Sequence, residues 1–365
     1  MIKEINFIQD NTPPLIRTIV INWVLTNKFI FSFPEVIYDL QENKKVFETK
    51  LKKYENNLNS IKTNNLIINR EKHIALKRIE FFKQVYDIEA NKFDKNWVIW
   101  NLPDYDKYSK IFFWAISKDI EKIDYLPKKN KKLNKTISKK ELIHLLNKTR
   151  EFIPNLQISF DNYPNFVVSV KKWVLVPDKF EYNLQEIITL FFHEMSHYIR
   201  GLNMKKNLWF VTQLSDNWEL EEGLALYNEY FYWNQIIDYG TYYPYYHKIY
   251  NYLMDENLSF EEKKQKTEEI LSYKWFSKEK SYNFFQRFYR FAPLGWEKML
   301  LKDSIYYNSY RKVNKLLESW YDLDLLMSIK WGLESIEYLI DWKKINNFEF
   351  RKYFETMVEE VRKIV

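Results

Sequence analysis

Residues that make tight turns are scarce in this chain, and this scarcity constrains its fold more than any other feature. Glycine occurs 5 times and proline 10 times among 365 residues. So few turn formers favour long helices joined by few tight turns. Hydrophobic residues make up 46% of the sequence and aromatic residues 19%, which is enough to build a sizeable core. We therefore expect a globular, mainly helical protein.

Apolar residues in the first third of the chain recur at helical spacing. Within residues 35–95 they stand three and four positions apart, which is typical of amphipathic helices; the clearest are Ile74, Leu76, Ile79, Phe81, Phe82 and Val85. We interpret this stripe as core and predict a helical N-terminal region over residues 1–125. The stretch LPKKNKKLNKTISKK follows, and a solvated basic linker over residues 126–139 explains it better than a binding site does.

The charge of the chain argues against a nucleic-acid-binding surface. The net charge of +7 comes from 56 basic and 49 acidic residues, and the two signs are intermixed along the sequence. Such a diffuse excess does not form a stripe that follows phosphates. We therefore expect no nucleic acid among the partners, although a basic scaffold that binds nucleic acid stays open as an alternative.

The absence of cysteine limits the chemistry that a site can use. With no cysteine in the chain, a metal could be held only by histidines and carboxylates. The N-terminus lacks the pattern of a signal peptide, and the apolar run at residues 19–25 is too short to span a bilayer. We expect a cytoplasmic monomer that does not enter a membrane.

The pattern changes after the basic run. Ser138 and Glu141 form a capping-box pattern that opens a short helix. Residues 165–178, NFVVSVKKWVLVPD, contain two β-branched, aromatic-rich runs, which predict two short strands or one bent strand ending at Pro177. The fold class is therefore α+β: mainly helical with a small sheet.

A second capping pattern opens the helix that carries the most informative motif. Asn183 with Glu186 predicts its start, and Gly201 predicts its end. The expected helix is about 17 residues long. It contains the stretch HEMSH at residues 193–197.

This motif can form half of a metal site. On a regular helix, His193 and His197 point about 40° apart around the axis, so both imidazoles can reach one ion. Glu194 lies about 100° from His193, close enough to reach a water on that ion. The alternative is a buried helix whose histidines hydrogen-bond to backbone carbonyls.

A third ligand is available 25 positions after the second histidine. Glu222, in the stretch NWELEEGLALYNEYFYW, precedes a glycine and a run with helical spacing. Together with His193 and His197 it would complete a His2Glu catalytic zinc site with one position left for water. The alternative is that Glu221 and Glu222 are a solvated acidic pair.

These stretches carry a resemblance to a known family. HEMSHYIRGLN and EEGLA resemble the signature stretches of the MATCAP-like family, the microtubule-associated tyrosine carboxypeptidases and their bacterial relatives with a QEGLA motif. VKKWVLVPDKFEYNLQEIITLFF and FQRFYRFAPLGWEKMLLKDSIYY are similar to two further segments of that family. EEGLA also resembles the stretch around the third ligand of gluzincin peptidases. The resemblance implies a zincin-like catalytic domain over residues 140–335, its HExxH helix beside a short sheet, followed by C-terminal helices over residues 336–365 packed on the core.

The family's chemistry implies roles for individual residues. His193, His197 and Glu222 would hold Zn²⁺ and Glu194 would be the general base. The other implied roles are oxyanion stabilisation by Tyr306 or Lys302, binding of a substrate carboxylate by Arg287 and Arg290, and orientation of a ligand or an arginine by Asp303.

Structural salt bridges explain Arg287 or Arg290 as well as substrate contact does. Arg200 and Asn203 also match family positions, which capping and packing explain equally well, and the lone His247 is interpreted as structural.

The resemblance implies a carboxypeptidase that removes a C-terminal, aromatic residue from a peptide or protein tail. The chain departs from the family in having H-E-x-x-H where the family has one more residue between the histidines, so we expect a regular helix to present the ligands. Two family glycines are also replaced, by Phe291 and by the run from Tyr307 to Tyr310. A catalytically silent relative that binds peptide tails, an endopeptidase and an aminopeptidase remain alternatives.

Overall fold

The chain folds into two compact units. The computed structural model describes residues 2–11, 23–25, 29–31, 48–86, 122, 135–162, 166–169, 173–208, 214–235, 244–255, 257–273, 304–337 and 347–364. Unit 1 consists of Met1–Tyr125 and Tyr245–Ile305, and unit 2 of Leu126–Pro244 and Tyr306–Val365. The region 140–335, which the resemblance assigns to one catalytic domain, is thus divided between the two units.

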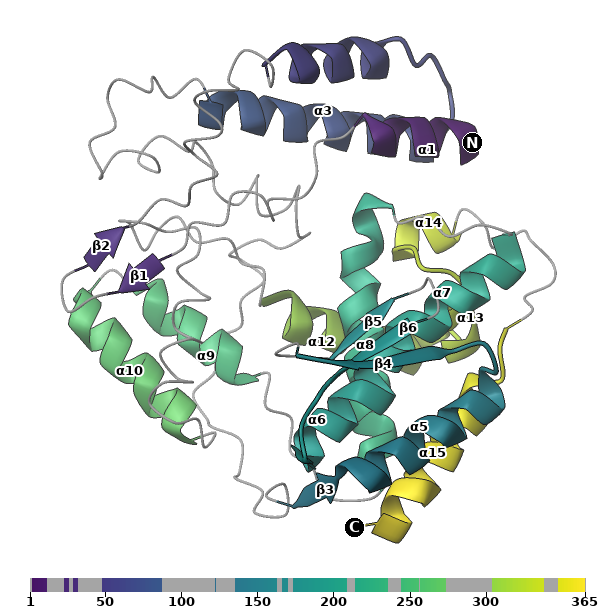
Figure 1. Cartoon of the computed structure of the whole chain (residues 1–365). Coiled ribbons are helices and arrows are strands. Elements are labelled where there is room, and N and C mark those ends of the chain that lie inside the picture. Colours follow the sequence, from purple (N-terminus) through teal and green to yellow (C-terminus); the bar gives the residue numbers. More distant parts are fainter. Residues whose placement is uncertain are drawn as a thin grey trace. The chain divides into compact units, whose positions relative to one another are not determined.

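The described residues of unit 1 are mainly helical (Figure 1). Its elements are α1 (Ile2–Asp10), a helical segment at 48–59, α3 (Leu66–Tyr86), α9 (Pro244–Leu253) and α10 (Phe260–Tyr273), with an antiparallel pair of short strands, β1 (Trp23–Leu25) and β2 (Phe29–Phe31). Ile74 and Ile79, from the predicted apolar stripe, are buried. α1 packs against α3.

Unit 2 contains the predicted small sheet. β4 (Gln157–Asp161), β5 (Val167–Ser169) and β6 (Trp173–Pro177) are arranged in the order β4-β6-β5. β6 runs parallel to β4 and antiparallel to β5. Two separate strands are therefore confirmed for the stretch NFVVSVKKWVLVPD, and the second of them ends at Pro177 as predicted.

A second, two-stranded sheet joins the start of unit 2 to the helix of the HExxH motif. β3 (Thr136–Ser138) pairs antiparallel with β7 (Glu181–Asn183). β3 lies inside the predicted basic linker, whose last residues are therefore a strand; residues 126–134 of that linker lie outside the described residues. Both β3 and β7 end at the N-cap residue of a helix.

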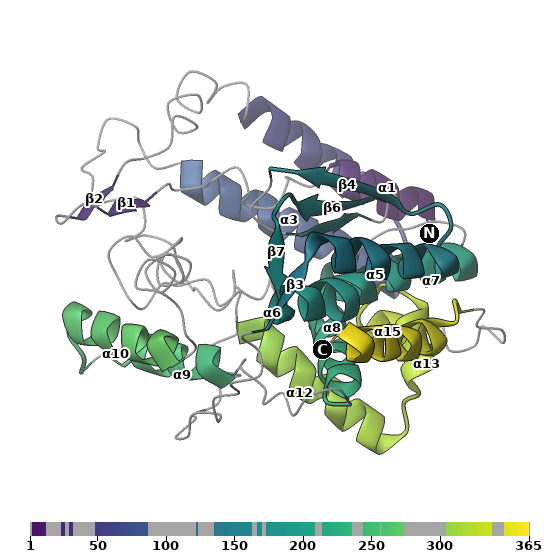
Figure 2. The same cartoon turned by 60° about the horizontal axis from the view of Figure 1, so that its bottom comes forward.

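The helices that flank this sheet begin as the sequence predicts. α5 (Lys139–Phe152) opens with the capping box of Ser138 and Glu141. It lies beside the C-terminal helix α15 (Phe350–Ile364), as Figures 1 and 2 show. A contact of 2.9 Å joins His144 Nε2 of α5 to Glu360 Oε2 of α15. The C-terminal helix is thus packed on unit 2.

The helix of the HExxH motif differs from the prediction in two ways. The capping box of Asn183 and Glu186 opens α6 (Leu184–Ile188) as expected, but a π-helical segment follows at Thr189–Glu194 before α7 (Met195–Leu208). The prediction of a regular helix is therefore wrong. The predicted end at Gly201 is also wrong, because α7 continues for seven more residues.

Tertiary contacts explain why the helix passes through Gly201. Arg200 Nη2 donates to Ile329 O and Trp331 O, and Asn203 Nδ2 donates to Met327 O. These bonds tie α7 to the segment around α13 (Leu323–Ser328) on both sides of the glycine. Packing of this kind overrides the weak local preference of one glycine for a helix end.

The remaining helices complete the core of unit 2. They are α8 (Trp218–Trp233), preceded by a 3-10 turn at Ser215–Asn217, α12 (Ser304–Ser319), which begins at the end of unit 1, α13, and α14 (Leu333–Glu337). The ring of Phe192 lies 5.9 to 6.4 Å from those of Tyr232, Trp233 and Phe354. Aromatic residues thus fill the core, as predicted. Within the described part of the chain, no helix is both long and apolar enough to cross a membrane.

Candidate metal centre

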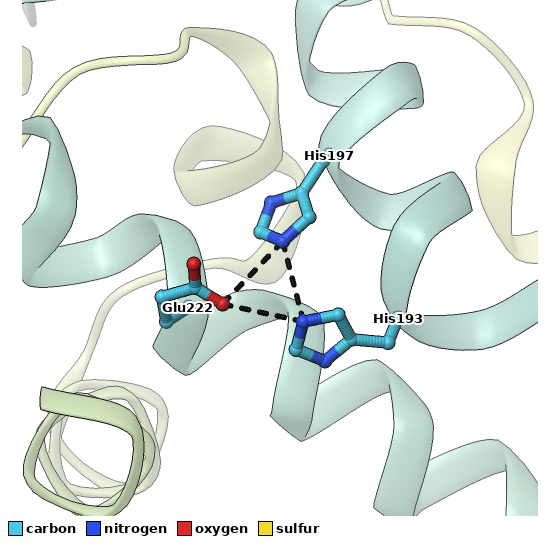
Figure 3. Close-up of side chains that lie close together, drawn as sticks. All are labelled: His193, His197 and Glu222. Carbon is cyan, nitrogen blue, oxygen red and sulfur yellow. Dashed lines mark hydrogen bonds and ion pairs between the residues drawn. The ribbon is translucent and has the colours of Figure 1, made fainter. Parts of the chain in front are cut away.

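The side chains of His193, His197 and Glu222 meet at one point in unit 2 (Figure 3). His193 comes from the π-helical segment, His197 from α7 and Glu222 from α8. The two Nε2 atoms lie 3.3 Å apart. Glu222 Oε2 lies 3.2 Å from Nε2 of His193 and 3.5 Å from Nε2 of His197. The sequence predicted these three residues as ligands, and together they could hold a metal ion.

The glycine of EEGLA explains how α8 reaches this position. A Cβ atom at Gly223 would lie 2.4 Å from the backbone oxygen of Ser309 in α12. Only glycine allows the two backbones to approach so closely. The residue after Glu222 therefore allows the close approach of α8 and α12.

Each histidine has a carboxylate on the side of the ring that faces away from Glu222. His197 Nδ1 lies 2.8 Å from Glu221 Oε1, and His193 Nδ1 lies 3.2 Å from Glu229 Oε2. Carboxylates in this position fix the orientation of an imidazole and raise its basicity toward a metal. Both are on α8, so one helix supplies the carboxylate ligand and the two carboxylates behind the histidines.

Sequence reasoning missed these two residues. In the sequence, Glu221 has the pattern of a solvated pair with Glu222, and Glu229 belongs to no motif. Glu221 is 4% exposed and Glu229 is fully buried. The available signal was that both stand in a helix made mostly of apolar and aromatic residues, where a buried acid needs a partner.

Two cations hold the carboxylate of Glu221. Lys330 Nζ lies 2.5 Å from Oε1, and Arg200 Nη1 donates to Oε2. Burial raises the pKa of Glu221, but Lys330, Arg200 and His197 outweigh it and lower the pKa well below its ordinary value. Arg200 is itself fully buried. Its role is therefore structural, which decides a point that the sequence left open.

Buried acidic side chains accompany the histidines among the residues that the structure describes. Glu221, Glu222 and Glu229 are buried there, together with the basic side chains of Arg200 and Lys330. Buried carboxylates are normally paired with cations or coordinate a metal.

The same carboxylates favour the protonated form of both histidines. Burial lowers the pKa of His193, but Glu222 and Glu229 outweigh it and raise the pKa well above its ordinary value. His197 behaves in the same way: burial lowers its pKa, but Glu222 and Glu221 raise it by more.

Two further predicted residues lie next to the histidines. Glu194 follows His193 directly, is half-buried, and has no hydrogen bond or ion pair with another described residue. The Tyr306 ring in α12 has its centroid 6.4 Å from that of His193. The other predicted site residues, Arg287, Arg290, Lys302 and Asp303, lie outside the described residues.

His247 and Asn203 both have packing roles. His247 is fully buried, and its Nε2 lies 3.2 Å from Ser304 O, as a structural histidine would. Asn203 donates to Met327 O and accepts from Phe348 N. Neither side chain is part of the group that could hold a metal ion.

Comparisons of the chain with protein families, with curated proteins and with solved structures found no match. The resemblance to the MATCAP-like family, which residues 140–335 carry, therefore stays a prediction.

Proposed function

We propose that unit 2 is a zinc-dependent peptidase centre, with zinc held by His193, His197 and Glu222. The observation that carries the proposal is the spacing of the three ligand atoms, 3.2, 3.3 and 3.5 Å. Ligands about 2.0–2.1 Å from a tetrahedral zinc are separated by about 3.3–3.4 Å. Two neutral imidazoles and a carboxylate are also a donor set that zinc prefers.

The state of Glu222 supports the same proposal. Its Oε2 atom is buried and has no hydrogen bond of acceptable geometry, although two imidazole nitrogens lie within 3.5 Å. A buried carboxylate oxygen that points between two nitrogens without bonding to either is suitably placed for a shared ion.

The chain's own residues then define a hydrolytic reaction. Zinc would supply a Lewis acid that makes a coordinated water acidic near neutral pH. Glu194 would accept a proton from the attacking water and pass it to the leaving amine, so that water adds across the peptide bond. The side chain of Glu194 has no hydrogen bond or ion pair with another described residue, which supports this role. The hydroxyl of Tyr306, or the ammonium of Lys302, would donate a hydrogen bond to the carbonyl oxygen.

We propose a carboxypeptidase, since the resemblance implies one and the predicted arginines suit its substrate. Arg287 and Arg290 would bind the terminal carboxylate of a peptide or protein tail, because a guanidinium can donate two parallel hydrogen bonds to it. Asp303 would orient one of them. A C-terminal aromatic residue is the expected leaving group.

The test uses the purified full-length chain and a set of peptides that vary in their last residue. We expect about one zinc per chain and release of the C-terminal residue, and Glu194→Gln should abolish cleavage while retaining zinc and fold, because it removes only the proton acceptor. Glu181→Gln, at an exposed glutamate of β7, is the matched control and should retain activity. Full activity of the protein after complete removal of metal would refute the proposal.

Peptides with an amidated C-terminus test the type of peptidase. Amidation removes the carboxylate that the arginines would bind, so cleavage should stop for a carboxypeptidase and continue for an endopeptidase or aminopeptidase. Zinc bound without cleavage of any peptide would instead identify a catalytically silent relative.

A further inference from the structure

The two carboxylates behind the histidines differ in what holds them. Glu221 contacts His197, Arg200 and Lys330. Glu229 is equally buried, but the described residues give it one ionic partner, His193 Nδ1 at 3.2 Å. Neither oxygen of Glu229 has a hydrogen bond of acceptable geometry to a described residue. Glu221 and Glu229 therefore lie in similar positions behind the histidines, but Glu221 has two basic side chains beside it in addition to its histidine.

This difference has a consequence for the energetics of Glu229. A carboxylate that is buried without a cation destabilises a protein by several kcal/mol. Glu221 has two such cations beside it, Arg200 and Lys330. Among the described residues, Glu229 can receive positive charge only through the imidazole of His193. A cation on Nε2 of that ring would make the Nδ1 hydrogen a stronger donor to Glu229.

We propose that Glu229 is the positioning residue of the metal site, whose carboxylate orients His193 and strengthens its bond to the metal, whereas Glu221 mainly stabilises the fold. The inference rests on the proposed zinc site but not on peptidase activity. Helix geometry supports it, because Glu222 and Glu229 are seven residues apart and so lie on the same face of α8, two turns apart. One face of α8 thus contacts His193 from both sides.

The decisive experiment measures zinc affinity and the stability of the metal-free protein in the same variants. Glu229→Gln keeps the volume and an acceptor oxygen but removes the charge; Glu229→Met removes both charge and acceptor. Glu221→Gln is the matched control, with the same change on the same helix. Zinc alone is the probe, titrated in competition with a chromophoric chelator, and the melting temperature is recorded without metal.

We expect Glu229→Gln to weaken zinc binding about 10- to 100-fold, and Glu229→Met to weaken it further. Both should lower the metal-free melting temperature less than Glu221→Gln does, because His193 is the one ionic partner that they affect among the described residues. Glu221→Gln should lower that temperature, because it leaves Arg200 and Lys330 with an uncompensated buried charge.

The proposal is overturned if Glu229→Gln changes zinc affinity less than about threefold, well below the usual effect of such a residue. It is also overturned if the Glu229 variants fail to fold, or if they lose as much metal-free stability as Glu221→Gln, since either result indicates a structural role. A wild-type chain that binds no zinc would overturn this inference together with the proposed function. A wild-type chain that binds zinc but cleaves no peptide would overturn only the peptidase assignment.

Discussion

At the scale of single residues, the site combines groups that the sequence identifies with groups that only the fold reveals. His193, His197 and Glu222 could be predicted because their spacing encodes a shared helix face and a nearby third donor. Arg200 could not be assigned, because an arginine in a helix has the same local pattern whether it is exposed or buried. Its burial depends on the carbonyls of Ile329 and Trp331, about 130 residues away in sequence.

Arg200 provides a test of the buried network. We expect Arg200→Met to lower the free energy of unfolding by about 3–5 kcal/mol, because it removes a cation from Glu221 and the hydrogen bonds of Arg200 to Ile329 O and Trp331 O. Urea denaturation measures the change. Arg351→Met is the control, since Arg351 pairs with Asp324 at 2.9 Å but 48% of its side chain is exposed; such a pair contributes about 0–1 kcal/mol. Equal losses in the two variants would contradict the described role of Arg200.

At the scale of elements, the starts of helices were predictable and one helix end was not. Both capping boxes are present, because the interactions of Ser138 with Glu141 and of Asn183 with Glu186 are local. The π-helical segment at Thr189–Glu194 was missed. Whether a helix changes from α to π winding here depends on how the buried residues of that segment, including Phe191 and Phe192, pack against α8. This packing cannot be predicted from the local sequence.

The contact between α8 and α12 gives a prediction about an element. Gly223→Ala should push the two helices apart, since its Cβ atom would overlap the backbone oxygen of Ser309. We expect a loss of about 1–3 kcal/mol or more in stability, as for other overpacked sites. Zinc affinity should also fall, because Glu222 is the preceding residue.

Calorimetry and zinc titration measure the two effects of Gly223→Ala. Phe231→Ala is the comparison, because Phe231 is 48% exposed on the same helix and its truncation should leave zinc affinity unchanged. A Gly223→Ala protein with the zinc affinity of the wild type would show that the position of α8 does not determine the geometry of the site.

At the scale of the whole molecule, the chain divides at Tyr125, directly before the lysine-rich run begins. Residues 245–305 group with the N-terminal unit, whereas the sequence placed them in the catalytic domain. Such a grouping depends on contacts between segments more than a hundred residues apart, and hydrophobic periodicity carries no information about them. All three residues that could hold the metal belong to unit 2.

Removal of metal should therefore affect the two units unequally. A ligand at 1,000 times its dissociation constant stabilises a folded protein by about 4 kcal/mol. We expect a chelator to accelerate hydrogen exchange in α7 and α8 at least tenfold, and to leave α3 and α10 in unit 1 nearly unchanged. Mass spectrometry of peptides from these helices measures both. Uniform acceleration across the chain would indicate that the metal stabilises both units together.

The assignment of donors to helices has a consequence for how this site can be taken apart. Both imidazoles precede residue 209, and the carboxylate ligand with its two acidic neighbours follows residue 213. If the chain were divided between α7 and α8, one fragment would hold the two imidazoles, and the other would hold Glu222 and the two carboxylates behind the histidines. Neither fragment would retain a complete set of donors, so recovery of tight zinc binding on mixing would report that the two fragments had reassembled.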